Sequence, residues 1–429
     1  MSKTSKLLDD CFAHDKKRML HDEAIGVLKQ RIGPVAGQER VKLPDAAGRL
    51  LFAAAITPHP IPAHTNAAVD GFSFAAADYD QDAGSEMPVD GRAAAGHRIA
   101  QRPAAGAAAR IFTGAVMPEG HDTVVMQEDV RFGTIAGGPV VAIPAGLRRG
   151  ANVRRAGEDV AEGEVLLQAG SLLRPQDLAA LASIGAGEVE CFARLKVGIV
   201  STGDEVVRAG AKLTPGQVYD ANAPMLAALV ASAGATPIDL GILPDDLQEV
   251  KTRLARAAQT VDVIVSSGGA SRGEEDHVVT ALDALGKRHL WQLAIKPGRP
   301  MSFGQIGDCV MLGLPGNPVA VFVCFLLYVW PLLRRMGGAA RWPEPTRYQL
   351  PALFAFPGRK VGRREFWRGI SRETANGLGV DKFARDGSGL ISGLRAADGL
   401  IDVPEDVPEI RQGDSVAFIP FSQFGILGN

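Results

Sequence analysis

The sequence predicts a multidomain protein that combines an α/β domain with β-rich domains, and three observations lead to this fold class. The chain has 429 residues, which exceeds what one hydrophobic core usually organises. Apolar strand and helix patterns alternate from Lys196 to Gly338, as is typical of a parallel sheet covered by helices on both faces. Short strand patterns without such helices recur on both sides of this region.

The composition narrows the function classes. Hydrophobic residues make up 46% and charged residues 22% of the chain, which is typical of a globular protein, and a net charge of −2 predicts neither a nucleic-acid nor a membrane partner. The first 20 residues are rich in charge and contain no apolar stretch suited to a signal peptide. The cysteines lack metal-ligand spacing. We therefore expect a cytoplasmic protein.

Before the α/β region, Gln38 to Ala54 favours helix in part, and residues 66–127 combine Ala, Gly and short β patterns that predict a small β-rich domain. A helix is expected from Arg174 to Ile184, because Pro175 suits a first helical position. After a linker at 341–345, short strands predict a small C-terminal β-barrel.

Within the α/β region, four apolar runs predict buried strands and four longer patterns predict helices. The strands are Lys196–Val200, Pro237–Gly241, Val261–Val265 and Cys309–Gly313. The helices are Ala223–Ala233, Asp246–Thr260, Asp276–Leu285 and Val319–Leu333. The last run has 15 residues, whereas a membrane-spanning helix needs about 20, so we interpret it as a core helix.

Polar or Gly-rich loops follow each of these strands. They are Ser201–Glu205, Asp245–Asp246, Ser266–Gly273 and Leu314–Pro318. Because the carboxyl ends of parallel strands meet at one edge of a sheet, we expect the four loops to share a ligand-binding rim. The Leu-Pro-Gly-Asn-Pro turn enters a helix and favours an anion, although taken alone it could be an ordinary strand-to-helix turn.

Three carboxylates stand in or beside these loops: Glu205, Asp245 and Asp276. Carboxylates there can hold a hydrated Mg²⁺ beside phosphates, or accept hydrogen bonds from the N–H groups of a purine or pterin. Asp245 as a helix cap and Asp276 as an acid of a first helical turn are the structural alternatives.

A second anion-binding candidate is Lys296-Pro-Gly-Arg-Pro300, which presents Lys296 and Arg299 from a backbone that cannot be helical. A surface turn with solvated cations is the alternative.

Taken together, these residues resemble the MoeA family, the molybdopterin molybdenumtransferases of molybdenum cofactor synthesis, which are related to the E domain of gephyrin. The resemblance runs in order along nearly the whole chain. Its motifs are Leu43–Arg49, Asp70–Phe72, Arg110–Gly114, Val124–Glu128, Arg154–Asp159, Ser201–Glu205, Ser267–Gly269, Lys296–Gly298 and Leu314–Pro318.

The resemblance implies a homodimer with four domains per protomer. These would be a split elongated domain (residues 1–59 and 160–190), an inserted β-rich domain (60–159), a MogA-like molybdopterin-binding α/β domain (191–340) and a C-terminal β-barrel (341–429). The site would lie between the last two domains of one subunit and the inserted domain of the other, which carries Asp70 and Thr113.

The implied reaction inserts molybdate into adenylylated molybdopterin and releases AMP with the help of Mg²⁺. Carried over by motif, Glu205, Asp245 and Asp276 would hold metal, pyrophosphate or pterin, and Asp70 and Thr113 would complete the catalytic set. Oxyanion contacts are expected from Lys296, Arg299, Arg363 and Ser388. The other ligand-binding positions are Ser201, Thr202, Gly203, Ser267, Gly268, Gly269, Pro315, Gly316, Asn317 and Pro318.

The chain departs from the family pattern at a few positions. Ala320 stands where a serine is frequent, Gln292 where a basic residue is frequent, and Arg272 adds charge to the loop after the third strand. The alternatives to the transferase are a gephyrin-like scaffold without turnover and a molybdopterin adenylyltransferase, while transient contacts with other cofactor-synthesis proteins are expected.

Overall fold

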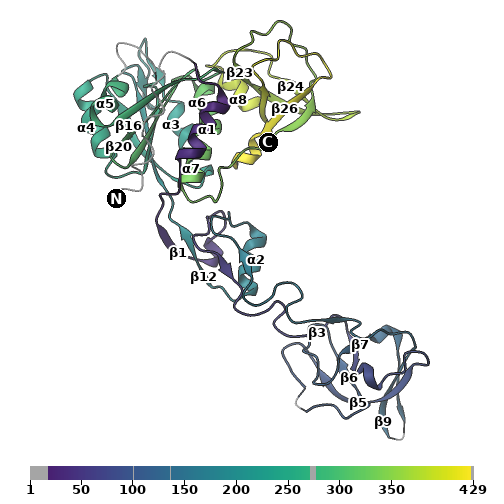
Figure 1. Ribbon diagram of the computed structural model, residues 1–429. Helices are drawn as coiled ribbons and strands as arrows, with labels where there is room; N and C mark the ends of the chain where they lie inside the picture. The colour runs from purple at the N-terminus through teal and green to yellow at the C-terminus, as the bar shows by residue number, and fades with distance from the viewer. Residues whose placement is uncertain (1–17, 100, 136, 271–276, 427–429) are drawn as a thin grey trace.

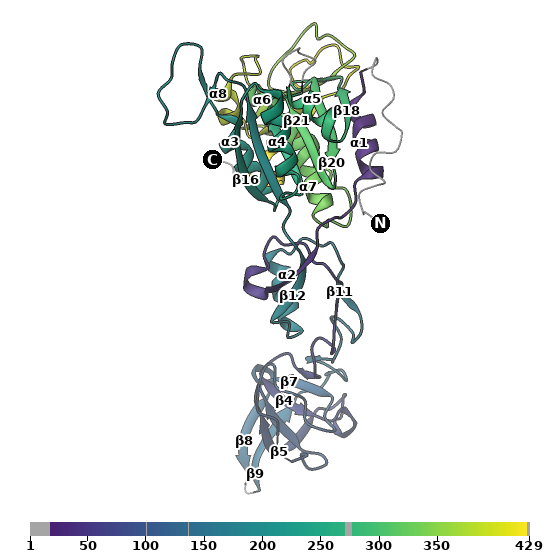
Figure 2. The same ribbon diagram turned by 90° about the vertical axis from the view of Figure 1, so that its left-hand side faces the viewer.

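The computed structural model describes residues 18–99, 101–135, 137–270 and 277–426. Its parts follow one another along an elongated molecule, with the α/β and C-terminal sheets at one end and a β-rich unit at the other (Figures 1 and 2). Two two-stranded pairings lie between these ends.

The middle of the molecule is built from two distant stretches of chain, which we call the N-terminal unit. Strand β1 pairs antiparallel with β12, and β2 with β11. Its elements are β1 (Gln38–Lys42), a 3₁₀ helix (Leu43–Asp45), β2 (Ala55–Ile56), β11 (Val165–Leu167), α2 (Pro175–Ser183) and β12 (Glu188–Phe192). Within Gln38 to Ala54, where partial helix is predicted, the helical part is the short 3₁₀ helix, whereas pairing with β12 holds Gln38–Lys42 extended. The helix behind Pro175 is confirmed.

Residues 66–154 form the distal β-unit, which is dominated by a six-stranded sheet in the order β7-β4-β6-β5-β9-β8. Its strands are β3 (Asn66–Ala67), β4 (Gly71–Phe74), β5 (Ser85–Ala93), β6 (Ala108–Ile111), β7 (Thr123–Met126), β8 (Arg131–Ile135), β9 (Gly138–Ile143) and β10 (Val153–Arg154). Short 3₁₀ helices lie at Ala76–Asp78 and Gln127–Asp129.

The α/β sheet has six strands in the order β16-β13-β17-β21-β20-β18. Its strands are β13 (Lys196–Thr202), β16 (Thr236–Leu243), β17 (Val263–Ser267), β18 (Lys287–Gln292), β20 (Pro300–Ile306) and β21 (Cys309–Leu314). Beside the sheet, β14 (Val206–Val207) and β15 (Val218–Tyr219) form a short parallel pair. Its helices are α3 (Asn222–Ser232), α4 (Leu247–Ala257), α5 (His277–Leu285), α6 (Pro318–Cys324) and α7 (Trp330–Met336). The N-terminal helix α1 (His21–Arg31) packs against the same core.

All four predicted strands are present and run parallel. The sheet is nevertheless mixed, because β20 and β18 extend it antiparallel. Pro300 and Gly304 obscured strand β20 in the sequence. A proline is tolerated at the first residue of a strand, and there it removes no essential ladder hydrogen bond.

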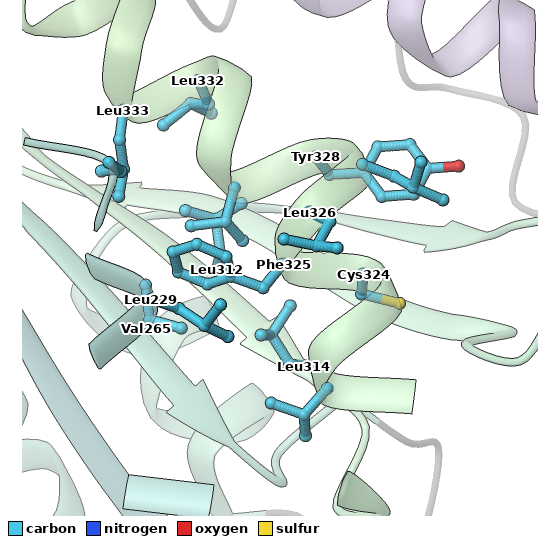
Figure 3. Close-up of a cluster of buried hydrophobic side chains, with 14 of the residues drawn as sticks. Leu229, Val265, Leu312, Leu314, Cys324, Phe325, Leu326, Tyr328, Leu332 and Leu333 are labelled. Carbon is cyan, nitrogen blue, oxygen red and sulfur yellow. The ribbon is translucent and has the colours of Figure 1, made fainter. Parts of the chain in front are cut away.

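The predicted core helix is confirmed, with a π-helical turn (Phe325–Val329) between α6 and α7. Among the described residues, Pro318–Met336 is the helix long and apolar enough to cross a membrane, and 83% of its most apolar 18-residue stretch is buried inside the fold. Figure 3 shows Phe325 and Leu326 of this helix packing beside Leu312 and Leu314 of β21. The π-turn therefore sits at the centre of the domain core.

The C-terminal domain contains a third six-stranded sheet, ordered β19-β23-β25-β26-β22 with β24 beside β23. Its elements are β19 (Ile295–Lys296), β22 (Tyr348–Pro351), β23 (Arg364–Thr374), β24 (Gly377–Lys382), α8 (Ile391–Ala396), β25 (Gly399–Val403), β26 (Ser415–Pro420) and a 3₁₀ helix (Phe421–Phe424). Strand β19 comes from the α/β region, so the two domains share this sheet. A single bridge joins Ala352, after β22, to Val380 in β24.

Candidate functional site

The predicted rim exists in the structure. Strand β13 is in register with β17 at Ser201–Ser267, and β17 with β21 at Ser267–Leu314, so these strands end at the same edge. Strand β16 ends beside Thr202. The loops that follow all four strands therefore open on one side of the sheet, at the end of the molecule away from the distal β-unit (Figure 2).

These loops surround a cavity of about 850 Å³, which we call the rim cavity. It brings together many of the residues singled out in the sequence. They are Ser201, Thr202, Gly203, Glu205, Asp245, Ser267, Gly268, Gly269, Gly316, Asn317 and Pro318. The predicted acid Asp276 lies outside the described residues.

Glycine is required at two positions of this rim. Gly203 has a φ of +117° and Gly268 a φ of +96°, which lie in the region that favours glycine. A Cβ on Gly203 would collide with the Glu205 carboxylate, and one on Gly268 with the Thr202 hydroxyl. The close approach of backbone to these polar groups gives the rim its shape.

The two described carboxylates of the predicted set are exposed on neighbouring loops. Asp245 is oriented by Asp204, since the Asp204 N–H donates to Asp245 Oδ2 at 3.3 Å and the Asp245 N–H donates to Asp204 Oδ1 at 3.1 Å. No group of three His, Cys, Asp or Glu side chains in the described part of the chain is close enough to form a preassembled metal cage.

A buried polar network behind the rim was not foreseen from the sequence. Ser201 Oγ donates to Asp220 Oδ2 at 2.6 Å, and Arg208 donates to the same oxygen at 2.9 Å. Asn222 Nδ2 donates to Ser267 Oγ at 2.6 Å and to the Gly316 carbonyl at 2.7 Å. Asn222 thus joins two rim loops, and the signal for it was the Asp-Ala-Asn triplet at the start of α3.

A second cavity, of about 590 Å³, lies between the α/β and C-terminal domains, and we call it the interdomain cavity. It shares Gly268, Gly269, Gly316 and Asn317 with the rim cavity, so the two are contiguous. The predicted residues Lys296, Pro315 and Ser388 also line it. The C-terminal domain adds Phe366, Trp367, Arg368, Lys382, Phe383 and Asp386.

Lys296 is placed in this cavity by β19, which pairs with the start of β23 and sets Lys296 opposite Glu365. The Lys296 Nζ lies 3.7 Å from Glu365 Oε2. Burial alone would raise the pKa of Glu365, but hydrogen bonds from Trp367 and Arg363 and the charges of Lys296 and Arg363 outweigh it and lower that pKa. Glu365 is therefore an ionised anchor for Lys296.

Arg299 and Arg363 do not line either cavity. Arg299 is exposed, and Arg363 donates to Glu365 at 2.9 Å. Arg368 lies in the interdomain cavity instead, with its guanidinium bonded to the carbonyls of Leu390 and Arg385. Arg368 was missed because it stands inside a strand pattern, where sequence alone does not reveal which face borders a cavity.

The remaining predicted pair, Asp70 and Thr113, lies on the distal β-unit. Thr113 donates to Asp70 Oδ1 twice, from its N–H and its hydroxyl, each at 2.7 Å. These two bonds, backbone first, lower the pKa of Asp70, and the charge of Arg110 adds to the effect. The pair is formed, but within one chain the structure does not bring it to the rim (Figure 1).

Three family models match the chain in succession. They are described as the MoeA N-terminal region (domain I and II), over residues 19–185, the "Probable molybdopterin binding domain", over 198–335, and the MoeA C-terminal region (domain IV), over 350–421.

Individual relatives agree with these matches over almost the whole chain. The chain is 34% identical to molybdopterin molybdenumtransferase of Haemophilus influenzae, covering 94% of this chain and 98% of the relative. It is 32% identical to molybdopterin molybdenumtransferase 2 of Mycobacterium tuberculosis, covering 92% and 96%. The crystal structure of the MoeA protein of Pyrococcus horikoshii superposes with a TM-score of 0.79 at 30% identity, covering 94% and 100%. The chain therefore belongs to the MoeA family of molybdopterin molybdenumtransferases, which act in molybdenum cofactor biosynthesis.

Proposed function

We propose that this protein inserts molybdenum from molybdate into adenylylated molybdopterin and releases AMP, with Mg²⁺ bound at the rim. The observation that carries the proposal is the pair of contiguous cavities, which share Gly268, Gly269, Gly316 and Asn317. One cavity is lined by carboxylates and polar loops, and the other by cations. A pterin nucleotide and an oxyanion would thus be held side by side.

The rim cavity suits the pterin nucleotide. Its lining offers carboxylate oxygens from Glu205 and Asp245, which can accept hydrogen bonds from pterin or purine N–H groups. Gly203 and Gly268 carry no side chain that would block a phosphate from the backbone.

The donor set at the rim also fits Mg²⁺. This ion binds oxygen ligands, keeps several waters and usually takes one or two carboxylates together with substrate phosphates. Glu205 and Asp245 supply such oxygens from neighbouring loops, and the predicted Asp276 would add a third. When bound, the ion would neutralise charge on the pyrophosphate.

The interdomain cavity suits molybdate. Lys296, Arg368 and Lys382 supply three positive charges, and Ser388 contributes from the facing loop. These groups would hold the oxyanion next to the dithiolene end of the pterin. The two reactants would then meet within one bound complex and would not have to find each other in solution.

We further propose that the active form is a cytoplasmic homodimer in which Asp70 and Thr113 of a second copy complete the rim. The preformed Thr113–Asp70 hydrogen bonds, on a unit far from the rim of its own chain, support this arrangement. Transient contacts with proteins that supply and receive the cofactor belong to the same proposal.

Turnover tests the function directly. Purified protein with adenylylated molybdopterin, molybdate and Mg²⁺ should release AMP and load molybdenum into the pterin. Binding without either product would indicate a gephyrin-like scaffold, and adenylylation of molybdopterin from ATP would indicate an adenylyltransferase. Either outcome would overturn the proposal.

Complementation tests the shared site. The variants Asp70→Ala and Asp276→Ala should each lack AMP release, while each remains dimeric by light scattering. Mixed one to one under exchange conditions, they should recover about a quarter of wild-type activity, because half of the dimers are then mixed and each has one intact site of two. No recovery after verified subunit exchange would contradict a site built from two subunits.

A further inference from the structure

The interdomain cavity carries an anion of its own. Among the described residues that line it, Asp386 is the one acidic side chain, beside the cations Lys296, Arg368 and Lys382. Lys382 Nζ donates to Asp386 Oδ1 at 2.7 Å. The Asp386 carboxylate is thus already bound to one of the cations that an incoming oxyanion would use.

Lys382 is firmly held in position. Its ammonium group lies 5.3 Å from the centre of the Phe356 ring and 5.4 Å from that of Trp367, and its side chain is only 10% exposed. Aromatic faces attract cations, and they also restrict the stem of the side chain. Asp386 is 55% exposed, so it is the partner that can leave the pair at lower cost.

Among the described residues, no acidic side chain accepts a hydrogen bond from the Arg368 guanidinium. Its guanidinium donates to two neutral carbonyls, of Leu390 at 3.1 Å and of Arg385 at 2.7 Å, and stacks 5.0 Å from the Phe383 ring. Asp386 compensates the positive charge of Arg368 through space. The hydrogen bond from Lys382, followed by the charges of Lys382, Lys296 and Arg368, lowers the pKa of Asp386.

The backbone next to Asp386 is also unusual. Gly387 has a φ of +136°, a conformation that other residues rarely adopt. Together with Gly389 it makes the segment between β24 and α8 rich in glycine. Such a segment restricts the position of Asp386 less than a strand or helix would, whereas Lys382 and Arg368 belong to strands β24 and β23.

We propose that Asp386 is an internal counter-anion that competes with a tetrahedral oxyanion for Lys382 and Arg368, and thereby sets the affinity and selectivity of this chain for its oxyanion substrate. The identity of that substrate as molybdate rests on the proposed function. A dianion carries twice the charge of one carboxylate and displaces it with a net electrostatic gain, whereas a monoanion gains little. The cavity therefore discriminates against monoanions.

Calorimetric titration of the full-length protein with sodium molybdate, at fixed pH and ionic strength, tests this competition. Asp386→Asn should bind molybdate about five- to tenfold more tightly than the wild type, because a partly screened negative charge is removed beside the ligand. Asp381→Asn is the matched control. Asp381 lies at the same end of β24 but pairs with Arg372 at 3.6 Å and does not line the cavity. The affinity of Asp381→Asn for molybdate should therefore stay within about twofold of the wild-type value.

A double-mutant cycle gives a readout that a merely structural role would not produce. Lys382→Met retains the apolar stem that packs on Phe356 and Trp367. It should weaken molybdate binding about twofold in the wild type, where Asp386 already occupies Lys382, and about tenfold in the Asp386→Asn background. Thermal unfolding of all four proteins checks that each is folded.

Unchanged or weaker binding by folded Asp386→Asn would overturn the proposal, and would mean that Asp386 orients the cations instead. Additive effects of the two substitutions would do the same, as would an absence of molybdate binding in every variant. Turnover separates this inference from the proposed function. A protein that shows the predicted coupling without releasing AMP retains the oxyanion site and lacks the transferase activity.

Discussion

Val319 donates its backbone N–H to the carbonyl oxygen of Ser388 at 3.0 Å, and this hydrogen bond joins the first turn of α6 to the loop before α8. The two residues come from different domains and both line the interdomain cavity. One of the free N–H groups expected at the start of α6, just after the Leu-Pro-Gly-Asn-Pro turn, is therefore committed to holding the domains together. The Val319 N–H group is therefore not available to an anion in this cavity.

Arg368 is expected to be the principal arginine for the oxyanion. Arg368→Lys should raise the KM for molybdate about tenfold, because a lysine cannot keep both carbonyl contacts and also present a planar donor pair to the ligand. Arg363→Lys is the matched control, with an expected change of about twofold or less, since Arg363 bonds to Glu365 and lies outside the cavity. Steady-state kinetics at saturating pterin substrate measures both. A larger rise in KM for Arg363→Lys than for Arg368→Lys would instead support Arg363 as the oxyanion contact, as the sequence predicts.

At Ala320, by contrast, a substitution is expected to strengthen molybdate binding. Ala320 is 2% exposed and lines the interdomain cavity, at a position where the resemblance to the family leads us to expect a serine. Ala320→Ser should tighten molybdate binding about fivefold, because one added hydrogen bond contributes about 1 kcal/mol. Calorimetry gives the comparison, and Ala227→Ser, on the partly buried side of α3, serves as a control for the added hydroxyl. Equal binding by wild type and Ala320→Ser would show that the hydroxyl does not reach the ligand.

Asn222 is expected to support the rim through stability as well as binding. Asn222→Ala removes the donors to Ser267 and Gly316 and leaves the buried Ser267 hydroxyl without this partner, which should lower the free energy of unfolding by about 1–3 kcal/mol. Urea denaturation measures this change. Asn376→Ala, in an exposed turn, should change stability by less than about 0.5 kcal/mol. A neutral Asn222→Ala would indicate that the two loops hold their positions without this bridge.

His21 should make the fold sensitive to mild acid. Burial lowers its pKa from 6.5 to about 4, the charge of Arg364 acts in the same direction, and its Nδ1 lies 2.8 Å from the Tyr328 hydroxyl. The unfolded chain then binds more protons than the folded one between these pH values, so stability is complete above pH 6.5 and is lost as the pH falls towards 4. The expected loss is about 2–3 kcal/mol.

Urea denaturation from pH 7.5 to 4.5 measures this loss. His21→Gln should flatten the curve, since glutamine does not titrate there, whereas the exposed His97→Asn should leave it unchanged. A wild-type curve that is already flat across this window would contradict the assignment.

Local sequence determined much of this protein. The apolar runs fixed β13, β17 and β21, and polar loops at their carboxyl ends identified the rim, because strand direction alone decides where parallel strands end. Collinear motifs along the chain are enough to identify the family. These features depend on neighbours in sequence, so they can be predicted from it.

Tertiary structure decided the rest. Whether Arg363 or Arg368 lines the interdomain cavity depends on how β23 packs beside β19. This pairing sets Lys296 opposite Glu365, although the two residues are 69 positions apart in the sequence. The same packing sets Asp386 among three cations and commits Val319 to Ser388. Register and packing between distant segments follow from the burial of whole sheets, and no local pattern of residues encodes them.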